Sequence, residues 1–105
     1  MIKFYGTLID NYSHHNFKMQ LYIKNDTHQI DENIGAIIEI KFSDVIVDAL
    51  FINNTLMIDG ITYKYFIKRQ NDELIFAAKE IRYFYQWLFS CFTSRKIIIA
   101  SNKKI

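Results

Sequence analysis

Residues 56–68 read LMIDGITYKYFIK, and this stretch decides the predicted fold. An Asp59-Gly60 pair between two apolar runs is the strongest short-range signal of a two-residue β-hairpin turn. The residues after this turn alternate between two sets, Tyr63, Tyr65 and Ile67 in one and Lys64, Phe66 and Lys68 in the other. Because successive side chains of a strand point to opposite faces, the alternation predicts a strand that is buried on one face.

Alternation with period two extends through the first half of the chain. Residues 2–9 and 17–24 alternate on either side of a polar cluster at 11–16, which predicts a hairpin. Another strand is expected over 36–43. Its alternation places on one face Ala36, Ile38, Ile40 and Phe42. β-Branched residues favour a further strand over 45–52, because they lose side-chain freedom in a helix.

Towards the C-terminus the period changes from that of a strand to that of a helix. Apolar residues recur along one helical face at Ile81, Phe84, Tyr85, Leu88, Phe89 and Phe92. This spacing predicts an amphipathic helix over residues 79–92, followed by a last strand at 97–99. Residues 73–78 fit either a strand or the start of a longer helix. Their position after a strand and the Asn71-Asp72 turn pair favours the strand.

The predicted fold class is therefore α+β, in a single domain that spans residues 1–105. It consists mainly of an antiparallel sheet of about six to eight short strands. The sequence leaves open whether this sheet is barrel-like or sandwich-like. One C-terminal amphipathic helix, over 79–92, is expected to pack against the sheet, and a final strand follows it.

Charge restricts the classes of partner. The formal net charge of +2 is too small for bulk electrostatics to indicate a nucleic-acid or membrane partner. The charge is uneven, however. Five Lys and eight Asp or Glu give −3 over residues 1–65, whereas eight Lys or Arg and three Asp or Glu give +5 over 66–105. A contact with a polyanion is therefore expected in the C-terminal third.

The number of cysteines and the length of the apolar stretches indicate in which cellular compartment the protein is expected. The lone Cys91 excludes an intramolecular disulfide, which suits a reducing compartment, so we expect a cytoplasmic protein without a membrane partner. The longest apolar stretch, 81–92, is much shorter than the roughly 20 residues of a membrane-spanning helix. Ile, Asn and Lys together supply 37 residues, a bias typical of AT-rich genomes and of mobile-element or phage DNA.

No stretch of the sequence has the spacing of a catalytic, cofactor or metal motif. His14 and His15 are adjacent and so point to opposite faces of an extended backbone, and no Cys or carboxylate completes a zinc spacing with them and His28. The three glycines are isolated, so no glycine-rich loop is present to hold a phosphate. We therefore expect no cofactor, and a non-catalytic protein is favoured over an enzyme or a small-molecule-binding protein.

Two kinds of binding remain. The favoured one is a protein-interaction module that forms a homodimer or engages another protein. Tyr83 and Trp87 are its candidate interface residues, because both types are enriched at interfaces. The alternative is an OB-like domain that binds single-stranded nucleic acid, with rings that stack on bases and cations that follow phosphates. Its candidate contacts are Lys18, Tyr22, Lys24, Lys64, Phe66 and Lys68.

Overall fold

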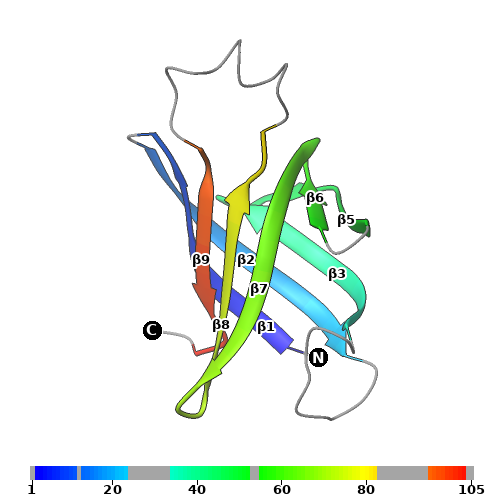
Figure 1. The fold of residues 1–105 in the computed structure, drawn as a ribbon, viewed down its shortest axis with the longest axis vertical. Coiled ribbons are helices and arrows are strands. Elements are labelled where there is room, and N and C mark those ends of the chain that lie inside the picture. Colours follow the sequence, from blue (N-terminus) through cyan, green and yellow to red (C-terminus); the bar gives the residue numbers. More distant parts are fainter. Residues whose placement is uncertain (1, 12, 24–33, 53–54, 83–94, 104–105) are drawn as a thin grey trace.

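The computed structural model describes residues 2–11, 13–23, 34–52, 55–82 and 95–103, and the regular secondary structure of these residues consists of β-strands (Figure 1). The strands are β1 (Ile2–Asp10), β2 (Ser13–Ile23), β3 (Ile34–Phe42), β4 (Val45–Val47), β5 (Ala49–Ile52), β6 (Thr55–Ile58), β7 (Ile61–Gln70), β8 (Glu73–Glu80) and β9 (Ile97–Ser101). Residues 73–78, which the sequence left between strand and helix, belong to a strand.

The predicted α+β class is wrong, because the described residues form an all-β structure without a helix. Lys79 and Glu80, where the spacing predicts the helix to begin, are the last residues of β8. Lys79 pairs with Ile97, and the Glu80 N–H donates to the carbonyl of Lys96 at 2.9 Å. These partners lie far along the chain, so local periodicity cannot reveal them. The rest of the predicted helix, 83–92, lies outside the described residues. No helix in the described part is long and apolar enough to cross a membrane.

The strands form one antiparallel sheet in the order β4-β3-β2-β1-β9-β8-β7-β6-β5. Each strand lies beside the next one in the chain, except that β4 and β5 form opposite edges and β9 returns to pair with β1. Only Asp48 separates β4 from β5, so residues 45–52 run as one bent strand that pairs first with β3 and then with β6. The sheet therefore nearly closes into an up-and-down barrel (Figure 1). Of the two arrangements that the sequence leaves open, the structure has the barrel-like one.

Two tight turns have the backbone conformation that two-residue hairpins require. Asp59 and Gly60 have φ angles of 51° and 80°, which confirms the predicted turn between β6 and β7. Ser43 and Asp44, between β3 and β4, have φ angles of 47° and 71°. Positive φ at both central residues matches the right-handed twist of paired strands, so each turn fixes the register of its hairpin.

Aromatic side chains from opposite walls meet inside the barrel. The ring centroid of Phe76 on β8 lies 5.8 Å from that of Phe4, 5.9 Å from that of Phe17 and 6.1 Å from that of Tyr65. The ring centroid of Phe51 on β5 lies 5.3 Å from that of Tyr65. The buried core comprises Phe4, Leu8, Phe17, Met19, Leu21, Ile40, Leu56, Ile58, Tyr63, Leu74, Phe76, Ala78, Ile98 and Ala100. These side chains pack inside the barrel, so the surface that remains for binding lies on its outside.

An irregularity in β3 changes the face of one predicted core residue. The pairing of β2 with β3 shifts register between Gln20 and Leu21, where Gln20 pairs with Glu39 and Leu21 pairs with Ile37. The extra residue, Ile38, is 51% exposed, whereas Ile37 packs against the core. The expectation that Ile38 shares the face of Ile40 is therefore wrong, because a bulge reverses the alternation on one side of it.

Candidate functional site

Three of the residues predicted to contact nucleic acid lie together on β7. Lys64, Phe66 and Lys68 occupy alternate positions of the strand, on the face opposite to the buried Tyr63. All three side chains are exposed, and that of Phe66 is 54% exposed although it is a large apolar group. The structure thus brings one half of the predicted nucleic-acid contacts onto a single strand face.

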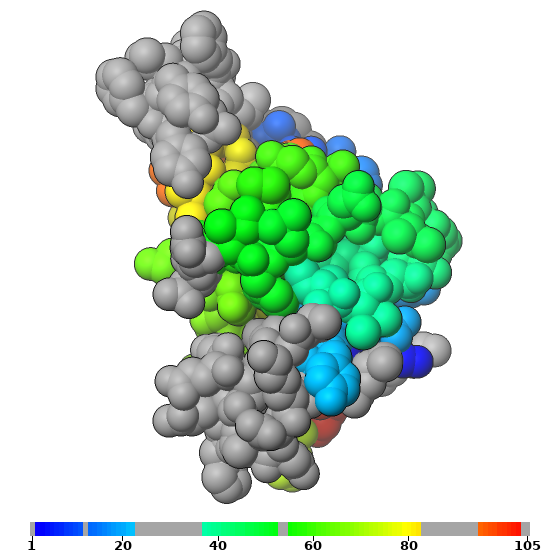
Figure 2. Space-filling view, turned by 90° about the vertical axis from the view of Figure 1, so that its right-hand side faces the viewer, coloured from blue at the N-terminus to red at the C-terminus, as the bar shows by residue number. Residues whose placement is uncertain are grey.

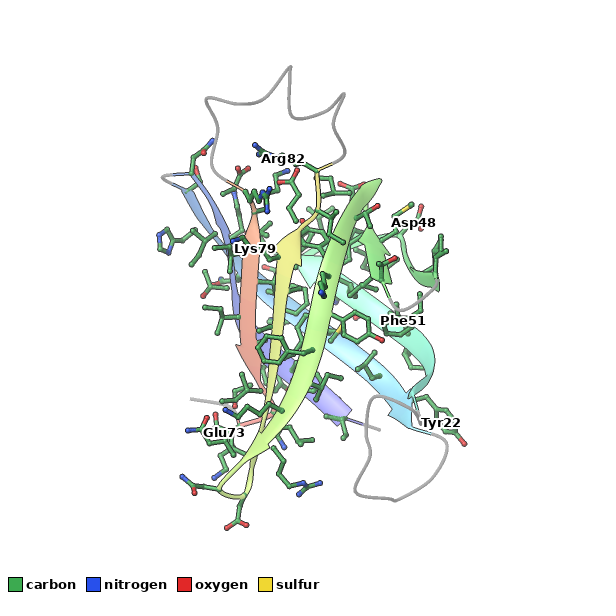
Figure 3. All side chains as sticks on the ribbon, in the orientation of Figure 1. Tyr22, Asp48, Phe51, Glu73, Lys79 and Arg82 are labelled. Carbon is green, nitrogen blue, oxygen red and sulfur yellow. The ribbon has the colours of Figure 1, made fainter. Side chains whose placement is uncertain are left out.

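Lys18 and Tyr22 lie on the other side of the barrel. Both are exposed residues of β2 and alternate with its buried side chains. Three strands separate β2 from β7 in either direction around the barrel when residues 45–52 count as one strand. Figure 3 shows Tyr22 near the end of β2, far from Lys79 on β8. The structure therefore does not bring these two residues together with the three on β7. Outside the described residues lie Lys24, Tyr83 and Trp87.

A groove lies over β7 and the end of β8, and we call it the β7–β8 groove. Its volume is about 340 Å³. It is lined by Lys64, Tyr65, Phe66, Lys79, Glu80, Ile81, Arg82 and Arg95. Lys64 and Lys79 are directly opposite each other on the two strands. Since like charges at opposite positions destabilise a sheet, this arrangement favours an anion between the two ammonium groups.

Lys79 and Arg95 are groove residues that the sequence does not single out. The sequence predicts that the helix begins at Lys79, so it does not place Lys79 in the sheet. In the structure Lys79 belongs to β8, and because Leu74, Phe76 and Ala78 are buried, the alternation of the strand places Lys79 on the outer face. That alternation is the signal that could have found Lys79. Arg95 reaches the groove because β9 pairs with β8, and no local pattern predicts this pairing.

A polar cluster borders the groove at the end of β8. The Arg82 Nε lies 3.3 Å from the Glu80 Oε2, and the two side chains are only 7% and 16% exposed. The Lys96 N–H donates to the other carboxylate oxygen at 3.0 Å. Glu80 therefore holds Arg82 and neutralises its charge. Among the described residues, no carboxylate lies within ion-pair distance of Lys64, Lys79 or Arg95.

Tyr63 lies inside the barrel and pairs with Glu80 across β7 and β8. Burial raises the pKa of its phenol well above the ordinary value of 10.0, and the negative charges of Glu80, Asp10 and Asp59 raise it further. The phenol therefore stays neutral at physiological pH.

A second surface, which we call the β3–β5 seam, collects exposed apolar side chains. It consists of Ile38, Ile46, Leu50 and Ile52, with exposed fractions from 40% to 63%. Val45 is exposed too, but it points to the core-facing side, because it precedes Ile46 on the strand and pairs with Phe42. Four of the eight exposed large hydrophobic residues of the described part therefore lie on this surface, within 15 consecutive positions. Figure 2 shows this face, where the atoms of β3 to β6 lie side by side.

The described residues contain no group of three His, Cys, Asp or Glu side chains that could hold a metal ion. Comparison of the chain with protein families, curated proteins and solved structures finds no match.

Proposed function

We propose that this protein is a non-catalytic protein-interaction module that pairs with a second copy of itself through the β3–β5 seam. The observation that carries the proposal is the concentration of exposed apolar side chains there. Water contact with apolar surface is unfavourable, and a contiguous apolar patch marks an interaction site in a folded protein. Burial of the patch by a partner would remove this cost.

The backbone of the seam supports strand pairing with that partner. Residues 45–47 pair with β3 and residues 49–52 pair with β6, so within the described part each half has one edge without a strand beside it. Unpaired edges bind other strands unless Lys, Pro or a bulge blocks them. The segment VIVDALFI at 45–52 contains no Lys, Arg or Pro, and Asp48 is its single charge.

A second copy fits these features better than an unlike partner. In a twofold dimer the same patch faces itself, so the surface must complement itself. Two identical apolar strands in antiparallel contact meet this condition. Glu39 and Lys41, which flank the seam on β3, already compensate each other at 3.5 Å. Asp48, exposed between the two halves of the bent strand, is then the one charge that the contact must leave in water.

Size exclusion with light scattering tests the proposal. We expect a particle of twice the 12.6 kDa chain mass. Ile46→Lys places a charge in the seam, and because Ile46 is 63% exposed the monomer should still fold. This variant is expected to be monomeric, since the dimer would have to bury an unpaired ammonium group.

Ile99→Lys is the matched control. Ile99 on β9 is 52% exposed, and three strands separate it from residues 45–52 in either direction around the barrel. We expect this variant to remain dimeric. A wild-type chain that stays monomeric at high concentration would contradict the proposal, and so would a control that dissociates as fully as Ile46→Lys.

A further inference from the structure

Cations flank an exposed ring at regular steps along β7. Lys64, Phe66 and Lys68 share one outward face, and two residues of a strand span about 6.6 Å. The spacing from charge to ring is therefore the same on both sides of Phe66. A nucleic-acid strand carries a matching pattern, because each base is attached between two successive phosphates.

The groove concentrates positive charge at the Lys64 end of this row. Lys79 lies directly opposite Lys64, and Arg95 lines the same groove. The two lysine side chains repel each other. A phosphate between them replaces this repulsion with charge-assisted hydrogen bonds, which are roughly twice as strong as neutral ones.

The surroundings of Phe66 favour a nucleic acid over an acidic peptide. Its partner across the strands is Ala77, whose small side chain leaves the ring uncovered on that side. An exposed flat ring is a platform on which any base can stack. Carboxylates of a peptide would satisfy the lysines, but they would leave the ring without a partner.

We propose that the outer wall of β7 and β8 binds single-stranded nucleic acid. One base stacks on Phe66, one phosphate lies between Lys64 and Lys79, and a neighbouring phosphate contacts Lys68. The site is independent of the dimer surface, because β6 lies between β7 and the bent strand of the β3–β5 seam. Lys18 and Tyr22, on the opposite wall, take no part in it.

Fluorescence anisotropy with a labelled oligothymidylate of about 16 nucleotides, repeated across salt concentrations, tests this site. The logarithm of the affinity should fall linearly with the logarithm of salt concentration. Phe66→Ala should weaken binding roughly 5- to 150-fold, the loss expected for one stacked base. Phe66→Leu keeps the apolar bulk without a ring and should weaken binding similarly. Lys64→Gln combined with Lys79→Gln should reduce the salt slope by about 0.7, since the two lysines share one phosphate and each neutralised phosphate of a single strand contributes about 0.7.

Matched controls come from the opposite wall. Tyr22→Ala removes an exposed ring and Lys18→Gln removes an exposed cation, and both should bind as the wild type does. A polyglutamate peptide should compete much less well than an unlabelled oligothymidylate. The proposal is overturned if the wild type shows no salt-sensitive binding, if either Phe66 variant binds as the wild type does, or if polyglutamate competes equally. A loss of binding in the Tyr22 or Lys18 variant equal to that of the groove variants would overturn it too.

Discussion

The Tyr63 side chain is 1% exposed, and its environment favours the neutral phenol. The folded chain therefore holds this proton to a higher pH than the unfolded chain, in which tyrosine titrates near pH 10. The contribution of the neutral phenol to the free energy of unfolding is fully present below about pH 10, and it is lost as the pH rises above that value. We expect the free energy of unfolding of the wild type to fall relative to Tyr63→Phe by up to about 1.4 kcal/mol per pH unit above pH 10. Urea unfolding at a series of alkaline pH values measures this difference.

Tyr22→Phe serves as the control for this measurement. Tyr22 is 49% exposed, so its removal should leave the alkaline loss of stability as in the wild type. If the free energies of unfolding of the wild type and Tyr63→Phe changed equally with pH, burial would not raise the pKa of the Tyr63 phenol.

For a single residue, the sequence predicts which face of its strand the side chain lies on, but it does not predict which residues of other strands lie beside it. Alternation along residues 63–68 places Lys64, Phe66 and Lys68 on the outer face, and the structure agrees. The same reasoning fails at Ile38, because one extra residue in β3 reverses the alternation. It also cannot show that Lys79 lies opposite Lys64, since that contact depends on the pairing of two strands.

The contact between β1 and β9 joins the first and last strands of the chain at the centre of the sheet, and it requires a glycine. Gly6 pairs with Ala100, and a Cβ atom at Gly6 would lie 2.5 Å from the Cα of Ala100 and 2.8 Å from its Cβ. Because backbone atoms line this position, the strands would have to move apart. We expect Gly6→Ala to lower the free energy of unfolding by about 1–3 kcal/mol, as measured by urea denaturation.

Thr7→Ala, at the next position of β1, is the control for Gly6→Ala. Thr7 pairs with Ile99 on the outer face of the two strands. Its replacement should change the free energy of unfolding by less than about 1 kcal/mol. A Gly6→Ala variant as stable as the wild type would mean that β1 and β9 are not in close contact.

Strands joined by short turns are predictable from the sequence, whereas distant pairings are not. The Asp59-Gly60 pair predicts the β6–β7 hairpin because the signal and both strands are contiguous. β8 extends to Glu80 because its last residues pair with Lys96 and Ile97. A local pattern includes these two residues in the helix whose apolar spacing begins at Ile81, and it therefore predicts an α+β fold.

The two proposed binding surfaces lie on different parts of the barrel because of the order of the strands in the sheet. The bent strand at 45–52 joins the two edges of the sheet and forms the β3–β5 seam, and β6 separates it from β7. Pairing through the seam therefore uses none of the residues of the β7–β8 groove. Dimerisation and nucleic-acid binding can thus be tested by separate sets of variants.

Pairing of β1 with β9 is the central claim, because it joins the two halves of the sheet and so assigns each outer residue to its wall. A Thr7→Cys and Ile99→Cys pair, in a Cys91→Ser background, tests it directly. Opposed residues of antiparallel strands lie about 4.5–5.5 Å apart at Cα, within the range of a disulfide. Thr7→Cys with Ile97→Cys is the control, since Ile97 pairs with Ile9, about 6.6 Å along the strand from Thr7. Mass spectrometry after mild oxidation should find an intramolecular disulfide in the first variant and not in the second. No disulfide in the first, or equal yields in both, would contradict the pairing of β1 with β9.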